Sequence, residues 1–171
     1  MIIVDQSVVS KLLVIQRERR TSLISEEEIK LDIRVVSVNL LENNTNMIEA
    51  ELHIYEEAPH NNKDVLLEVY FNAKKISKNA EDFFSALQEI RKELEKESIL
   101  ILCNGSALNI YPSPMQRTCS KAYVLELGFH AKLANMVDIF DNMEGLTYAT
   151  VDEQEEFYNK WIDSPKKHKD G

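Results

Sequence analysis

The Tyr111-Pro112-Ser113-Pro114-Met115 stretch has the most unusual composition in the chain, and Arg117 and Lys121 nearby add positive charge to an otherwise acidic protein. Two prolines in the Tyr111-Pro112-Ser113-Pro114 run restrict the backbone, because proline locks its own φ and pushes the preceding residue towards an extended conformation. A small molecule with an anionic group could lodge there. The candidate ligand-binding residues are Ser106, Tyr111, Ser113, Arg117 and Lys121. The alternative is a structural cover over a sheet edge.

Cys103 ends a continuous apolar run and comes shortly before Gly105. A cysteine at the end of a buried strand could act as a nucleophile, but it needs a base to become a thiolate. His130 is the only histidine nearby in sequence, and spacing alone does not bring the two together. A thiol packed in the core is the simpler interpretation, so no catalytic residue is assigned.

The histidines are not spaced as metal ligands, since HxH, HExxH and CxxC patterns are all absent from the sequence. Asp138, Asp141 and Glu144 could gather around a hard cation, but the ligand spacing of a calcium loop is missing. The chain has four glycines, whereas a Rossmann turn or a P-loop needs several in one short loop. We therefore expect no metal and no cofactor.

The chain is acidic, with 29 acidic and 20 basic residues and a formal net charge of −9. The electrostatic field of this negative charge repels nucleic-acid phosphates, and acidic neighbours offset a basic cluster at positions 11–20. We expect no nucleic-acid partner, and a basic protein suits the charge better. Tyr158 and Trp161 are candidate partner-binding residues because aromatic side chains anchor interfaces, although at helical spacing they more often pack inward.

Length and composition predict one domain. The 171 residues contain 44% hydrophobic residues, which is enough for a core. We predict a single domain over residues 1–164 and a disordered tail over residues 165–171. Two cysteines do not form a disulfide framework, and the best apolar stretch, at positions 8–15, is too short to span a bilayer. We expect a cytoplasmic protein without membrane contact, while its oligomeric state stays open.

Alternating apolar residues predict strands ahead of the first helix. The first strand runs from Ile29 to Leu40, and its apolar residues change face at Val35-Val36, so we expect a β-bulge near Val36. The second strand, Ile48 to Ile54, follows turn residues at positions 42–46 and completes a hairpin. Further strands are predicted at Val65 to Phe71, Ile99 to Cys103 and Ala122 to Leu127, and Val137 to Phe140 is strand-like.

Two stretches have helical spacing. The first covers Phe83 to Leu94, with Asn79 as the predicted N-cap. The second follows Thr150, which forms a capping box with Glu153. Because the strands precede the first helix as hairpins, we predict an α+β fold: a mainly antiparallel sheet, a long central helix, and a C-terminal helix packed on it.

The C-terminal third carries short motifs: Cys-Asn-Gly at 103–105, Tyr-Pro-Ser at 111–113 with Met115, Ala-Tyr at 122–123, Leu127-Gly128, Val-Asp-Ile-Phe at 137–140, and Val151, Gln154, Phe157, Trp161 and Ser164. Through these motifs, residues 102–164 resemble an uncharacterised bacterial domain family of unknown function. Glycines of the family pattern are replaced here by Pro114 and Lys121. The resemblance implies one structural unit that includes the last helix, and it brings no activity.

Two hypotheses follow. The first is a non-enzymatic acidic binding protein, of the kind represented by an immunity protein or an antitoxin that covers a basic bacterial toxin. The second is a small-molecule-binding domain or an enzyme with its site in the 104–121 loop.

Overall fold

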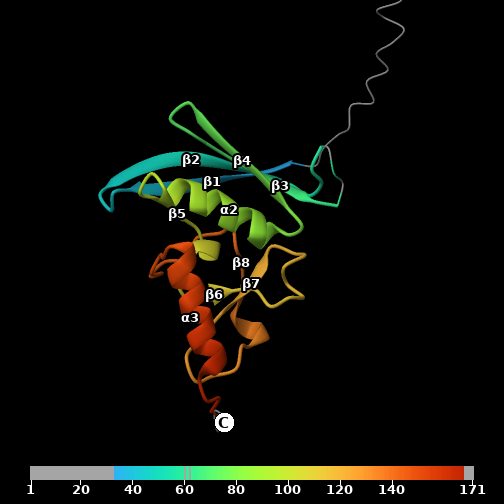
Figure 1. Cartoon of the computed structure of the whole chain (residues 1–171), viewed down its shortest axis with the longest axis vertical. Helices are drawn as coiled ribbons and strands as arrows, with labels where there is room; N and C mark the ends of the chain where they lie inside the picture. Colours follow the sequence, from blue (N-terminus) through green and yellow to red (C-terminus); the bar gives the residue numbers. More distant parts are fainter. Residues whose placement is uncertain (1–32, 60, 62, 168–171) are drawn as a thin grey trace, which may run out of the picture. The chain divides into compact units, whose positions relative to one another are not determined.

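The computed structural model describes residues 33–59, 61 and 63–167 (Figure 1). The start of the first predicted strand, the basic cluster at positions 11–20 and tail residues 168–171 lie outside the described residues. The elements of the first part are β1 (Ile33–Glu42), β2 (Asn46–Tyr55), β3 (Val65–Phe71), β4 (Lys74–Ala80), α2 (Phe83–Glu95) and β5 (Ile99–Leu102). They are followed by η1 (Asn104–Ser106), β6 (Ile110–Tyr111), β7 (Lys121–Val124), η2 (Leu133–Asn135), β8 (Met136–Asp138) and α3 (Val151–Asp163).

The predicted α+β class is confirmed, but the strands divide between two sheets instead of one. A curled five-stranded antiparallel sheet has the order β4-β3-β2-β1-β5, and a three-stranded antiparallel sheet has the order β6-β7-β8. The strands β1 to β4 form two consecutive hairpins. α2 then carries the chain across one face of the large sheet, so that β5 pairs with β1 (Figure 1).

The core lies between α2 and the face of the sheet that it covers. Leu40, Leu52 and Leu67 project from neighbouring strands and are fully buried. Leu87 and Ile90 meet them from the apolar stripe of α2. Burying each side chain of this size stabilises the fold by about 1.5–3 kcal/mol, which explains why the periods of two and of 3.6 in the sequence predict these elements well.

The predicted β-bulge near Val36 is wrong. β1 and β2 pair without interruption from Ile33 opposite Tyr55 to Glu42 opposite Asn46. The apolar residues change face because Ile33 and Val35 point away from the core, where they are 45% and 52% exposed. An apolar residue on the solvent side of a strand therefore resembles a shift in register when only the sequence is read.

α2 agrees with the predicted helical stretch to within one residue, but it begins at a different cap. It has 13 residues, as many as α3, so the prediction of a long central helix is not confirmed. Its N-cap is Asp82, whose Oδ1 accepts a hydrogen bond of 2.7 Å from the Ser85 amide. The predicted cap, Asn79, lies in β4 and donates to Asp64 at 2.9 Å. β4 is not among the predicted strands because its lysine-rich sequence has low strand propensity.

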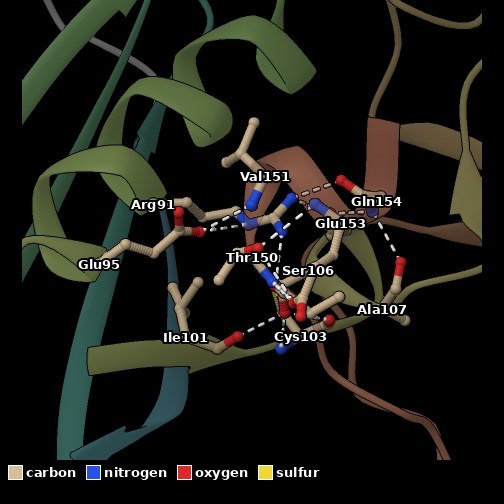
Figure 2. Close-up of polar contacts among 12 residues, drawn as sticks. Arg91, Glu95, Ile101, Cys103, Ser106, Ala107, Thr150, Val151, Glu153 and Gln154 are labelled. Atoms are coloured by element: carbon tan, nitrogen blue, oxygen red, sulfur yellow. Dashed lines mark hydrogen bonds and ion pairs between the residues drawn. The ribbon is translucent and has the colours of Figure 1, made fainter. Parts of the chain in front are cut away.

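A buried polar cluster connects α2, η1 and α3 (Figure 2). Arg91 of α2 is 2% exposed and donates to the carbonyl oxygens of Gly105 at 3.1 Å and Ala149 at 2.8 Å. It also donates to Oε1 of Gln154 in α3 at 2.5 Å, while the nearest carboxylate oxygen, on Glu95, is 4.0 Å away. Burial lowers the pKa of Arg91. Neutral oxygens thus hold a buried charge at the junction of three elements.

Gln154 completes this cluster from the other side. It is 0% exposed, and its Nε2 donates to the carbonyl oxygens of Gly105 at 3.0 Å, Ala107 at 2.7 Å and Ile110 at 2.9 Å. Gly105 fits here because an added Cβ would lie 2.5 Å from Cδ2 of Leu87. The path of the chain after β5 is therefore set by one amide side chain of α3.

The capping box predicted for the last helix is confirmed, because the Thr150 and Glu153 side chains each accept from the other's main-chain amide. α3 ends before Ser164. Beyond it, the Lys167 amide donates to the Gly128 carbonyl at 2.7 Å. None of the helices in residues 33–167 has the length and apolar character that crossing a membrane requires.

A candidate binding groove on the outer face of the sheet

The face of the five-stranded sheet opposite α2, here called the outer face, carries side chains that alternate with those of the core. The register places these side chains in rows across β2, β3 and β4. One row is Glu51, Tyr70 and Lys75, and the next is His53, Glu68 and Ser77. The two rows form one continuous polar and aromatic surface.

A groove of about 810 Å³ lies where the two hairpins separate. β2 begins at Asn46, but it pairs with β3 only over Glu51–Tyr55, and the β3–β4 hairpin then runs at an angle to β1 and β2 (Figure 1). The side chains of the outer face that line the groove are Ser37, Asn39, Glu49, Glu51, Tyr70 and Lys75.

The groove also contains strand main chain without a strand partner. The two-residue turn at positions 72–73 requires Tyr70 to direct its N–H and C=O towards β2, opposite Glu51. Every second residue of β2 points its main-chain groups the same way, so Glu49, which lines the groove, and Met47, farther along β2, direct theirs to this side. In the part of the chain that the structure describes, no strand pairs with β2 at these two positions on this side.

The two sides of the groove carry opposite charges. Lys74 and Lys75 on the hairpin side are already paired, with Glu97 at 2.5 Å and Glu68 at 2.6 Å. On the β2 side, Glu51 is 64% exposed and contacts only a histidine, and Glu49 is exposed without an ion-pair partner among residues 33–59, 61 and 63–167. The unpaired charge in the groove is therefore negative.

Glu68 is a buried carboxylate beside this groove. Its side chain is 8% exposed, and four neighbours donate to it. Oε2 accepts from the hydroxyls of Tyr70 at 2.6 Å and Tyr55 at 3.2 Å. Oε1 accepts from the Ser77 hydroxyl at 3.1 Å and from the Lys75 ammonium at 2.6 Å. Donors on three strands thus keep this carboxylate in a fixed orientation.

The protonation of this cluster follows from its contacts. Burial alone would raise the pKa of Glu68, but the hydrogen bonds from Lys75, Tyr70 and Ser77 outweigh burial and hold that pKa below its usual value. Burial and the nearby Glu68 carboxylate raise the pKa of Tyr55. The hydrogen bond to Glu68 raises the pKa of Lys75. At neutral pH the ionised Glu68 carboxylate therefore holds the protonated Lys75 ammonium.

The ring of Tyr70 lies between two groups. Its centroid is 4.6 Å from that of His53, and the Lys75 ammonium lies 5.4 Å from it over the ring. Tyr55, Glu68 and Tyr70 are not among the site residues predicted from the sequence. Their signal in the sequence is the polar half of the alternation in the second and third strands.

Ser106 and Tyr111, two of the residues proposed from the sequence as ligand contacts, are both buried. Ser106 is 1% exposed, and its hydroxyl donates to the carbonyl oxygens of Ile101 and Cys103. Tyr111 stacks on Tyr158 with ring centroids 3.9 Å apart and an interplanar angle of 11°. Both side chains are used to hold the turn after β5 and the α3 helix in place.

The other three candidates contact separate parts of the protein. The Ser113 hydroxyl donates to Oε1 of Gln116. Arg117 lies over the ring of Tyr111 and donates to the Ser85 hydroxyl at 3.3 Å, next to the cap of α2. Lys121 pairs with Asp138 at 3.4 Å. Of the five candidates, the structure brings only Tyr111 and Arg117 into contact with each other.

The two residues proposed as partner anchors are half-buried. Trp161 donates from its indole N–H to the Phe129 carbonyl at 2.9 Å, and the Lys166 ammonium lies 3.9 Å from the centroid of its ring. Tyr158 lies between Tyr111 and Trp161. Most of this aromatic surface therefore packs within the fold.

Cys103 is fully buried, its Sγ lies 3.9 Å from the Ser106 hydroxyl, and burial raises the pKa of its thiol. Arg91 and Gln154 lie in the same cluster (Figure 2). Within the described residues, no three histidine, cysteine or acidic side chains are grouped so that they could hold a metal ion.

Comparison with protein-family models finds no match for this chain. Comparison with curated proteins finds no match either.

Proposed function

We propose that this chain is an acidic binding protein, of the immunity or antitoxin type, whose groove takes an extended basic segment of a protein partner such as a bacterial toxin. One observation carries the proposal. The groove combines the main chain of Glu49, which has no strand partner on this side among the described residues, with the carboxylates of Glu49 and Glu51, and the open edge of β2 continues to Met47. An extended peptide could add to β2 where β3 diverges, and its lysine or arginine side chains would meet these carboxylates.

The charge of the whole chain supports the same partner. A net charge of −9 attracts a basic protein over a range set by the Debye length and speeds its encounter. Pairing with the main chain would supply affinity for any extended segment, whereas the two carboxylates would select a basic one.

The test uses two ten-residue peptides, one of alternating lysine and threonine and one of alternating glutamate and threonine, titrated into the full chain by NMR. We expect the lysine peptide to bind and to shift the amide signals of Met47 and Glu49. Replacing Glu49 and Glu51 by glutamine should weaken binding about two- to thirtyfold, at about 0.2–1 kcal/mol per exposed ion pair.

The matched control replaces Glu126 and Glu144, two exposed acidic residues away from the groove, by glutamine. It changes the net charge by the same amount and should retain most of the binding. The proposal is wrong if both peptides bind equally, if neither binds, or if the control weakens binding as much as the groove variant.

A further inference from the structure

Beside the groove, one of the chain's own lysines occupies a site with the chemistry of a cation receptor. Lys75 is 48% exposed and reaches inward, so that its Nζ lies 2.6 Å from Oε1 of Glu68 and 5.4 Å from the centroid of the Tyr70 ring. A carboxylate with an adjacent aromatic face is a general way to hold an ammonium or guanidinium group.

The site would keep its geometry without Lys75. Oε2 of Glu68 is held by the hydroxyls of Tyr70 and Tyr55, and Oε1 also accepts from Ser77. Removing Lys75 would therefore leave the carboxylate oriented, with one lone-pair direction of Oε1 open on the solvent side.

The location connects this site to the groove. Glu51, Tyr70 and Lys75 stand opposite one another on β2, β3 and β4, so neighbouring positions are separated by about 4.8 Å between strands. All three also line the groove. A peptide paired with β2 at Glu49 would lie in line with β3, and Glu68, opposite His53, stands four residues farther along, about 13 Å between main chains. A long lysine or arginine side chain of the peptide, lying along the outer face, would extend towards the Glu68 carboxylate.

We propose that Glu68 and Tyr70 form a receptor for a lysine or arginine side chain of the bound partner, and that Lys75 is its built-in occupant and competitor. This inference rests on the proposed function, because the partner segment must lie in the groove. Binding then exchanges one cation for another at a carboxylate that is never left unpaired, while Lys75 moves into solvent.

The test compares Lys75→Gln with Lys74→Gln, using the lysine–threonine peptide as the probe. Both variants remove one positive charge from the same hairpin, but Lys74 pairs with Glu97 and not with Glu68. We expect Lys75→Gln to bind the peptide about two- to fivefold more tightly than Lys74→Gln, as expected from the loss of an exposed competing ion pair.

A direct readout comes from the protein's lysines after reductive methylation with ¹³C, with the Lys75 signal assigned by its absence from Lys75→Gln. Adding unmodified peptide should move this signal towards that of an exposed lysine and leave the Lys74 signal in place. Glu68→Gln should weaken peptide binding, with its folding checked by thermal melting.

The outcomes separate the two proposals. If the wild type binds the peptide but Lys75→Gln and Lys74→Gln bind it equally and the Lys75 signal does not move, the exchange is refuted, the groove stands, and Lys75–Glu68 only stabilises the hairpin. If neither the wild type nor Lys75→Gln binds the peptide, both proposals fall.

Discussion

Replacing Gln154 by leucine tests whether one amide side chain holds the C-terminal part of the fold to α2. Leucine has a similar volume but neither donates nor accepts hydrogen bonds. The change would remove a donor from the carbonyl oxygens of Gly105, Ala107 and Ile110, and one acceptor from Arg91. The Gly105 carbonyl would keep its bond from Arg91, and the Ala107 carbonyl would keep its bond from the Ile110 amide.

The magnitude follows from the burial of these groups. A buried polar group that loses its partner costs about 1–3 kcal/mol, and relaxation or an entering water recovers part of the sum. The Ile110 carbonyl loses its donor outright, and the other three groups each lose one of several hydrogen bonds, at about 0.5–1.5 kcal/mol per bond. We therefore expect Gln154→Leu to lower the free energy of unfolding by about 2–5 kcal/mol, which is about 4–20 °C in Tm for a chain of this size.

Urea denaturation followed by far-UV circular dichroism measures this loss. The matched control is Asn159→Leu, which introduces the same apolar side chain on the exposed side of α3 and should change stability by less than about 0.5 kcal/mol. A loss below about 1 kcal/mol for Gln154→Leu, or an equal loss for Asn159→Leu, would refute the reasoning.

Three further outcomes are expected. The pKa of Glu68 lies below its usual value, so the ionised carboxylate contributes fully to stability above about pH 4.3, and this contribution is lost as the pH falls through the lower pKa that Glu68 has in the folded protein. The urea midpoint, measured as a function of pH, should therefore fall less steeply towards acid in Glu68→Gln than in the wild type. Gly105→Ala should cost about 1–3 kcal/mol through its clash with Leu87, measured by thermal unfolding, and the cost should shrink when Leu87 is replaced by valine. Ellman's reagent should modify exposed Cys119 promptly and buried Cys103 only on unfolding; prompt reaction of both thiols would contradict the burial of Cys103.

Much of the fold can be predicted from patterns among residues that are close together in the sequence. The apolar stripe of the first helix and the Thr150–Glu153 capping box predict the two helices because each depends on residues close in sequence. The β4 strand could not be predicted in this way. Its lysines face solvent or acidic side chains, and it is a strand because β3 provides a pairing edge across a two-residue turn.

The candidate site was harder to predict than the fold. Glu68, Tyr55 and Tyr70 come from two strands, and only the register of β2 against β3 brings them together. In the sequence each resembles an ordinary solvent-facing residue. The Asn104–Lys121 stretch attracted attention for its composition, but its hydroxyl groups and cations contact the α2 cap, the chain after β5 and the small sheet.

The position of Gln154 has a consequence for dividing this chain into pieces. A fragment that stops before α3 would keep Arg91 inside the remaining helix and lose an acceptor that makes its burial tolerable. The truncated chain could lower that cost only by letting water reach the Arg91 guanidinium, which would loosen the packing of α2 against the sheet. We therefore do not expect the N-terminal strands to fold as a self-sufficient module, and a C-terminal truncation should weaken the packing of Arg91, 63 positions before Gln154.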